Sequence, residues 1–296
     1  SQESIDCFTI LDINPLTRIE LRNVGVNDLV AKECLHSFRN NRTLRFKRYL
    51  EVSDDILWFL GWYTAEGHSE VDGYRSGLTL HEDEINIARE LQIILSEINI
   101  SSRISNCKNS KAISLRWSSP VLNAWLKKTF GDRAKNKIMP AWIKELPKER
   151  LVHYISGLCT GDGWSRGFTS SSRDLVIDTF DCLLKIGIKS NIKLDYYETG
   201  RGLMPQGTKR KDSIRSYLDI FSEHVEHYKE VLDRSLPEVN NEIGGKSFIY
   251  DGKYFSKIRS IKELDINVPV FDLEIEDYHY YIVERTCVHN TEPQRR

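Results

Sequence analysis

The chain has 296 residues, of which 40% are hydrophobic and 29% charged, and its formal net charge is −1. These are the proportions of a globular protein long enough for two domains. The six cysteines are scattered with no C-x-x-C pair, which argues against a disulfide framework or a zinc site and favours a reduced, cytoplasmic location. No apolar run reaches the roughly 18 residues of a membrane span, so no membrane partner is expected.

Charge is unevenly distributed along the chain. Residues 101–150 hold 12 Lys/Arg against 3 Asp/Glu, residues 182–216 hold 8 against 3, and residues 51–100 hold 2 against 11. Solvated charged faces are the usual explanation of such runs. Basic stretches that follow acidic ones are also what a phosphate-binding surface beside a metal site needs.

The pattern of residues 1–48 predicts strands and turns, with strand-like runs at 8–12 and 18–21 around an Asn-Pro turn. A helix is then expected over residues 54–66, because Ser53 is a suitable N-cap and two acidic residues follow it. This helix is apolar, carries small residues four apart at Gly61 and Ala65, and ends on Glu66 before a glycine. A strand at 73–81, a helix from 81 and a strand at 113–117 should follow.

Residues 151–164 repeat the layout of the first motif. Gly157 and Gly161 are four apart, and Asp162 stands before a glycine, 96 positions after Glu66. Residues four apart share a helix face, so the two helices can pack backbone to backbone and release both carboxylates side by side. A glycine after each acid suits a helix C-terminus. Such a carboxylate pair suits a hard divalent cation such as Mg²⁺, whereas the alternative is two unrelated buried helices with solvated terminal acids.

The segments that follow the two motifs are also alike. Residues 91–104 and 180–192 both read as a helix that enters a strand through Ile-x-Ser-x-Ile. The paired motifs and these segments together resemble LAGLIDADG homing endonucleases. The resemblance implies a pseudo-twofold αββαββα nuclease over 49–243, with repeats of about 49–150 and 151–243. It also implies that Glu66 and Asp162 bind Mg²⁺ as catalytic residues and that the substrate is double-stranded DNA.

In this family the sheet residues face the DNA major groove. The resemblance therefore makes DNA-contact candidates of Arg103, Lys111, Arg116, Lys193, Arg201, Lys209, Arg210 and Lys211. A solvated strand face or a mobile surface loop would explain these residues equally well. Lys193 and Lys209 are also the candidates for a basic catalytic residue near the metal. Residues 137–143 resemble the linker Lys-Ile-x-Pro-x-Trp that precedes the second motif, and a helix is expected over 217–236.

The stretch 240–245 is the clearest boundary, and the chain beyond it has the texture of β structure, with strands expected at 248–250 and 256–261 around an Asp-Gly turn. Residues 270–282 and 287–291 resemble the last two sequence blocks of inteins. Residues 24–30 resemble an N-terminal intein strand more weakly. The resemblance implies that residues 1–48 and 244–290 form a Hint splicing domain.

The intein resemblance assigns chemistry to five residues. Asn290 would cyclise onto its own carbonyl, with His289 and His279 as the acid–base pair. Thr291 would supply the acceptor hydroxyl, and Asp272 would assist that step. An intein begins with a Cys or Ser nucleophile in its first block, which is not evident after the first residue. We therefore expect this block to be absent or supplied by a separate N-terminal intein fragment.

The expected fold class is α+β: a duplicated αββαββα LAGLIDADG nuclease inserted in a β-rich Hint domain, with 291–296 beginning the C-extein. The expected function is that of an intein-encoded, site-specific DNA endonuclease with C-terminal splicing machinery. Its partners would be the DNA target and the host-protein exteins. The alternatives are a non-cleaving DNA- or RNA-binding relative of the nuclease and a purely structural domain.

Overall fold

The structure is a computed structural model, and it describes residues 4–6, 34–39, 42–47, 49–70, 75–108, 110–198, 213–238, 247–250, 253–256, 260–263, 280–283 and 286–289. The chain divides into two compact units, Ser1–Phe255 and Ser256–Arg296. Within the described residues, no helix is both long and apolar enough to cross a membrane.

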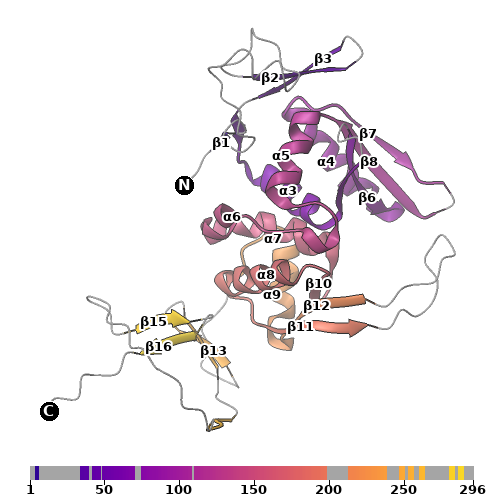
Figure 1. Cartoon of the computed structure of the whole chain (residues 1–296). Helices are drawn as coiled ribbons and strands as arrows, with labels where there is room; N and C mark the ends of the chain where they lie inside the picture. Colours follow the sequence, from indigo (N-terminus) through magenta and orange to yellow (C-terminus); the bar gives the residue numbers. More distant parts are fainter. Residues whose placement is uncertain are drawn as a thin grey trace. The chain divides into compact units, whose positions relative to one another are not determined.

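The first half of the larger unit follows the order helix, two strands, helix, two strands, helix (Figure 1). Its elements are α3 (Asp54–Glu66), β5 (Gly67–Ser69), β6 (Arg75–His81), α4 (Ile85–Glu97), β7 (Ser102–Asn106), β8 (Ala112–Ser118) and α5 (Pro120–Phe130), with the short η2 (Glu82–Glu84) before α4. The four strands form an antiparallel sheet in the order β5-β6-β8-β7. As expected from sequence, Ser53 caps α3 by accepting a hydrogen bond from the Ile56 amide at 3.2 Å.

The second half repeats this order. It comprises α7 (Lys148–Asp162), β9 (Gly163–Trp164), β10 (Gly167–Ser170), α8 (Arg173–Ile186), β11 (Ser190–Glu198), β12 (Ser213–Ile220), the short η4 (Ser222–His224) and α9 (Val225–Leu232). Its antiparallel sheet has the matching order β9-β10-β12-β11. The expected duplication of an αββαββα arrangement is therefore confirmed. Two short helices, η3 (Ala134–Asn136) and α6 (Ala141–Glu145), join the halves.

The remaining described strands form isolated pairs. They are β1 (Ser4–Asp6) with β4 (Tyr49–Glu51), β2 (Cys34–Arg39) with β3 (Arg42–Lys47), β13 (Ser247–Tyr250) with β14 (Lys253–Ser256), and β15 (Tyr280–Val283) with β16 (Thr286–His289). The expected strands at 8–12 and 18–21 lie outside the described residues.

Two sequence-based expectations about secondary structure are wrong. The expected helix over 217–236 begins only at α9, because residues 217–220 belong to β12, where Leu218 and Ile220 are buried and alternate with Tyr217 and Asp219. This alternation is the period of a strand. The strand expected at 256–261 is the second error. The strand that follows the Asp-Gly turn is β14, which begins directly after the turn, and residues 260–263 have no regular structure.

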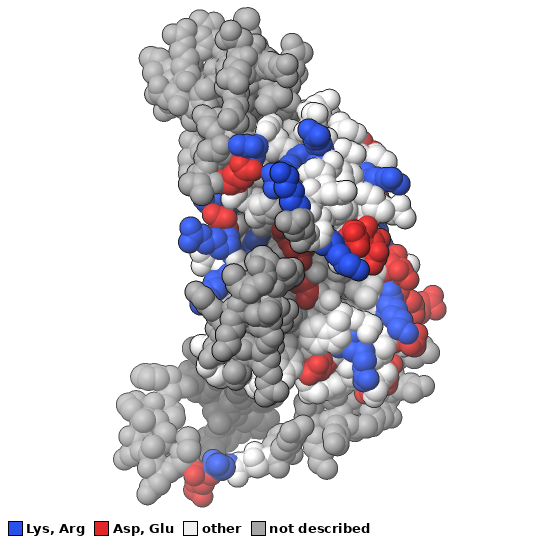
Figure 2. Space-filling model, turned by 90° about the vertical axis from the view of Figure 1, so that its right-hand side faces the viewer, with Lys and Arg blue, Asp and Glu red and all other residues white. Residues whose placement is uncertain are grey.

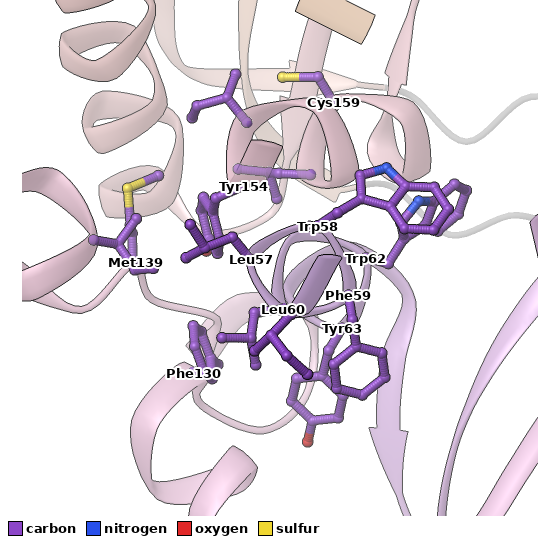
Figure 3. Packing of buried hydrophobic residues seen from close by; sticks show 14 of the residues in the cluster. Leu57, Trp58, Phe59, Leu60, Trp62, Tyr63, Phe130, Met139, Tyr154 and Cys159 are labelled. Atoms are coloured by element: carbon purple, nitrogen blue, oxygen red, sulfur yellow. The ribbon is translucent and has the colours of Figure 1, made fainter. Parts of the chain in front are cut away.

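Helix α3 is the centre of the hydrophobic core. Every residue from Ile56 to Thr64 is buried, and its side chains radiate on all sides (Figure 3). A helix that is apolar all round must be enclosed by other elements. Sheet and helices of the first half cover part of α3, with Phe59 packed edge-on against Trp117, and α7 covers the remainder.

The contact between α3 and α7 is made by backbone. A Cβ atom on Gly61 would lie 2.2 Å from the carbonyl oxygen of Tyr154, and one on Gly157 would lie 2.2 Å from the carbonyl oxygen of Trp58. Real Cβ atoms do not approach so closely, so glycine at both positions is a steric requirement. The expected packing of the two motif helices along their small residues is confirmed.

The end of the second half returns to the start of the first. Arg234 lies beyond α9, and its guanidinium carbon is 3.5 Å from the centre of the Trp58 ring. The same guanidinium pairs with Asp55 at 3.4 Å and with Glu90 at 2.6 Å. The two ends of the duplicated segment are therefore held together.

We predict that Gly157→Ala lowers the free energy of unfolding by about 3 kcal/mol or more, because the added methyl group forces the helix backbones apart. Urea denaturation followed by circular dichroism measures the change. Asn86→Ala is the matched control, since Asn86 is exposed on α4, and it should stay within about 0.5 kcal/mol of the parent. Equal stability of the two variants would contradict the close packing.

Candidate functional site

Glu66 and Asp162 lie at the ends of the paired helices α3 and α7. The last turns of the helices touch, because a Cβ atom on Gly161 would lie 2.5 Å from that of Ala65. The two carboxylates therefore leave neighbouring turns, as the sequence predicts. Helix α3 leads directly into strand β5, and helix α7 leads directly into strand β9.

The glycine after each acid has a different role from the one expected. Gly67 has φ −70° and Gly163 has φ −107°, so neither adopts the left-handed conformation of a glycine helix cap. A Cβ atom on Gly67 would lie 2.2 Å from the Tyr63 carbonyl oxygen, and one on Gly163 would lie 2.1 Å from the Cys159 carbonyl oxygen. Glycine is required because the outgoing strand crosses tightly over the last turn of the helix.

The two carboxyl groups are electrostatically coupled. Burial, with a smaller contribution from the neighbouring Asp162, raises the pKa of Glu66 to about 7. Burial also raises the pKa of Asp162 to about 6, although Lys137 and Arg215 oppose this shift. Two half-buried acids, one of which disfavours the ionised form of the other, are a site at which a bound cation would relieve the cost of ionisation.

Lys137 is a third member of the site that sequence reasoning did not identify as functional. Its side chain is 3% exposed, and its ammonium group donates a hydrogen bond of 2.8 Å to the Tyr63 carbonyl oxygen near the end of α3. The ammonium lies 4.3 Å from the centre of the Tyr63 ring. Burial lowers the Lys137 pKa to about 8, while Asp132, Asp162 and Glu66 oppose the shift. The signal in the sequence was a lysine at the start of the apolar linker segment 137–143.

Lys137 also bridges the two halves of the protein. Its backbone carbonyl accepts a hydrogen bond of 2.7 Å from the Ser172 hydroxyl, and Ser172 caps α8. The side chain thus binds the first half and the backbone binds the second. This arrangement fixes the ammonium group beside both carboxylates.

The carboxylate pair does not form a complete metal cage. Among the described residues, no group of three or more His, Cys, Asp or Glu side chains is arranged to hold a metal ion. Neither Glu66 nor Asp162 forms an ion pair within 4.0 Å in that part of the chain. The oxygen donors and their desolvation fit a divalent cation that takes its remaining ligands from water or from a bound phosphate.

Each sheet packs its helices on one face and leaves the other face open, and the two sheets lie on the same side of the α3–α7 pair (Figure 1). Arg103 and Arg116 are exposed and stand directly opposite each other on β7 and β8. Lys111 stands just before β8 and pairs with Glu82 at 3.8 Å. Figure 2 shows the side on which the sheets lie, with Lys and Arg interspersed among Asp and Glu.

Among the described residues, Lys193 contacts tyrosine rings of the second sheet. Lys193 is exposed on β11, with its ammonium group 4.0 Å from the Tyr196 ring centre and 5.6 Å from the Tyr217 ring centre. The positive charges that act on Glu66 and Asp162 belong to Lys137 and Arg215. The expected roles of Lys193 in catalysis and DNA contact remain predictions.

Several expected site residues lie outside the described residues: Arg201, Lys209, Arg210, Lys211, Asp272, His279, Asn290 and Thr291. His289 is the last residue of β16 and is paired across the hairpin with Tyr280, which follows His279 in the sequence. Their assigned splicing roles remain predictions.

No family model matches the chain. It is 29% identical over 304 residues to a replication factor C small subunit of Methanocaldococcus jannaschii, covering 92% of this chain and 15% of that protein. It is 24% identical over 281 residues to a DNA polymerase of Thermococcus litoralis, covering 84% and 16%. A SufBD-family iron–sulfur cluster assembly protein of Mycobacterium leprae is 28% identical over 152 residues, covering 46% and 16%. The chain spans less than a third of the length of each curated relative it matches.

The solved structures similar to this chain include LAGLIDADG proteins. One is the homing endonuclease I-DmoI in complex with its target DNA and in the presence of manganese, which is 20% identical with a TM-score of 0.45, covering 63% of this chain and 99% of that one. Another is the N-terminal LAGLIDADG domain of WhiA, at 12% identity and a TM-score of 0.39, covering 62% and 86%. The DNA and metal in these descriptions belong to the neighbours, and the properties of this chain follow from its own helix pair and sheets.

Proposed function

We propose that this chain is an intein that carries a LAGLIDADG homing endonuclease, which cuts double-stranded DNA at a specific site. The observation that carries the nuclease proposal is the meeting of Glu66, Asp162 and Lys137 at the touching ends of α3 and α7. The two helices lead directly into two antiparallel sheets of matching strand order. A duplicated protein of this design can engage both strands of a duplex.

The proposal of an inserted element is supported by the names of the relatives. A DNA polymerase, a replication factor C small subunit and an iron–sulfur cluster assembly protein have unrelated activities. Each contains a segment similar to this chain that makes up 15% or 16% of its length. A segment shared by such different proteins is expected of an insertion that contributes nothing to the activity of its host.

In the proposed nuclease, Glu66 and Asp162 hold the divalent cation, with Mg²⁺ as the expected ion. Such a cation activates water and stabilises the leaving oxygen in phosphodiester hydrolysis. Lys137 remains mostly cationic at neutral pH, since its pKa is about 8. Its fixed ammonium group offsets the negative charge that two carboxylates and a phosphate bring to one place. The exposed residues of the two sheets would position the DNA.

We predict that Glu66→Gln and Asp162→Asn each abolish double-strand cleavage of a plasmid carrying the host gene without its insertion. Lys137→Met should lower the cleavage rate by about 100- to 1,000-fold, because it removes a fixed charge from the reacting phosphate. Lys193→Met is the comparison, and it should affect DNA affinity more than the rate of the bound complex. Gel electrophoresis of the plasmid measures cleavage, and a mobility shift measures binding.

Two outcomes would contradict this assignment in different ways. Full cleavage by both carboxylate variants would show that another site acts. Specific binding by the parent protein without any nicking would favour the alternative, a relative that binds DNA or RNA without cutting it.

The raised carboxyl pKa values predict an effect on stability that is independent of cleavage. The folded chain disfavours ionised Glu66, so its stability falls as pH rises from the unfolded pKa near 4 to the folded pKa of about 7. We expect Glu66→Gln to raise the free energy of unfolding by about 1–2 kcal/mol at pH 8 in EDTA and to change it little at pH 4. Urea denaturation at the two pH values measures this.

Magnesium should also change the free energy of unfolding, because it would bind the ionised carboxylates. At pH 8 it should stabilise the parent protein and leave the Glu66→Gln/Asp162→Asn double variant unaffected, because only the parent retains the ionised pair. A parent protein whose stability is the same at pH 4 and pH 8, or the same with and without Mg²⁺, would argue against the site.

The C-terminal part is proposed to catalyse protein splicing. Asn290 cyclises and releases the amine of Thr291, His289 and His279 move the protons, Asp272 assists, and Thr291 accepts the acyl group. The pairing of Tyr280 with His289 supports this proposal, because it brings the sequence neighbour of His279 opposite the residue that precedes Asn290. The host-protein exteins, and an N-terminal splicing segment in the same or a separate chain, are the expected partners.

We predict that Asn290→Ala blocks release of residues 291–296 when an N-terminal splicing segment is supplied, because the cyclising amide is lost. Mass spectrometry of the product detects the missing tail. DNA cleavage by the same variant should equal that of the parent protein, which serves as the control for folding. Release of the tail at the parental rate would show that the bond breaks by another route.

A further inference from the structure

The open faces of the two sheets differ in chemistry. The exposed and half-buried side chains of the first-sheet face include His68, Arg75, Thr79, Arg103 and Arg116, and those of the second-sheet face include Trp164, Thr169, Asn191, Lys193, Tyr196, Arg215, Tyr217 and Asp219. These residues alternate along their strands with residues such as Leu115 and Leu218, which are buried. The first face is thus rich in arginine, and the second combines three aromatic rings with polar and charged side chains.

Two arginines dominate the first-sheet face. Arg103 and Arg116 are directly opposite on neighbouring strands, a placement of like charges that costs stability unless an anion lies nearby, and the Glu70 carboxylate lies 4.0 Å from Arg116 Nη1. The stem of Arg116 lies against Gly77 of the next strand, where a Cβ atom would be 3.2 Å from Arg116 Cγ. Arg116 Nε donates a hydrogen bond of 3.0 Å to the Ser114 hydroxyl, and its side chain remains 52% exposed. Its guanidinium is therefore oriented on the sheet and accessible.

The second-sheet face carries an assembled aromatic cluster. Tyr196 and Tyr217 meet edge to face with ring centres 5.9 Å apart, and Lys193 lies over the Tyr196 ring. Trp164 lies against Gly167, where a Cβ atom would be 2.4 Å from its ring. Trp164 and Tyr196 are nevertheless 41% and 43% exposed. Apolar rings are thus presented to solvent from three different strands.

A β-bulge places Tyr196 in this cluster. The register of β11 against β12 shifts between Lys193 and Tyr196, so two residues three apart share one face. Asp195 within the bulge has φ 53°, its amide donates to the Ser216 hydroxyl at 3.0 Å, and its carboxylate pairs with Arg173 at 3.1 Å. Without the bulge Tyr196 would point to the opposite face. The exposed ring is therefore held in place by its own set of contacts.

We infer that the two halves of the protein read DNA half-sites of different base composition: the first-sheet face selects guanines and the second-sheet face selects thymines. The inference rests on the proposed endonuclease function. A guanidinium fork pairs with the O6 and N7 acceptors of guanine, whereas an apolar surface gains contact with the thymine methyl group. In the second half Lys193 lies over two tyrosine rings and Arg215 acts on Asp162, so among the described residues of this face the rings are the main surface offered to bases.

Selection of binding sites from a randomised duplex library, in EDTA so that no cutting occurs, tests the inference. The parent protein should enrich duplexes with guanines in one half and thymines in the other. Arg116→Lys keeps the charge and removes the fork, so it should reduce guanine enrichment by about tenfold and leave the salt dependence of binding unchanged. Arg89→Lys, an exposed arginine on α4, is the matched control and should change neither.

The thymine preference of the second-sheet face can be tested by removing a single methyl group from the DNA. Deoxyuridine in place of thymine removes only the methyl group, and it should weaken binding by the parent protein several-fold when placed in the thymine-rich half. Tyr196→Ala should bind both duplexes equally and retain its guanine preference. Tyr196 is exposed, and urea denaturation confirms that the variant folds.

The outcomes distinguish the inference from the function on which it rests. Enriched sites with the same composition in both halves, or an unchanged guanine preference in Arg116→Lys, would overturn the division of half-sites while leaving the endonuclease standing. Absence of any enriched duplex would overturn both.

Discussion

The backbone contact between α3 and α7 is the constraint on which the rest of the structure depends. Glycine at positions 61 and 157 lets each helix approach the carbonyl oxygens of the other. Only at this distance do the two helices end together and bring Glu66 beside Asp162. A wider spacing would hydrate both acids and return their pKa values toward the ordinary range. The packing of the core therefore sets the electrostatics of the site, and the close approach serves both.

Lys137 completes this arrangement from the segment between α5 and α7. It lies in the linker, binds the first half through its side chain and the second half through its backbone carbonyl, and is buried beside both acids. A buried ammonium group is costly unless opposite charge surrounds it. The carboxylate pair and the lysine thus stabilise each other's charged forms, and the linker is part of the site as well as a connection.

Much of the fold could be predicted from sequence because its signals are local. The small residues of the two motifs, the Ser53 cap and the alternation in β8 act within one or two elements, and the structure agrees with them. Lys137 was missed because its neighbours in space come from three distant segments. The strand at 217–220 was missed because four residues of alternation adjoin a helical pattern. The bulge that orients Tyr196 leaves no mark in composition, since it depends on Arg173 and Ser216 from other elements.

The pairing of Arg234 with Asp55, which joins the two ends of the duplicated segment, has a consequence for how that segment connects to the rest of a chain. The chain enters the duplicated region beside the point at which it leaves. A folded body with adjoining ends can be gained or lost at a single surface turn of another protein, because the host chain need not be stretched to accommodate it. The salt bridge and the Trp58 ring beneath it thus close the duplicated region at its own ends, which is what the proposed inserted element requires of its structure.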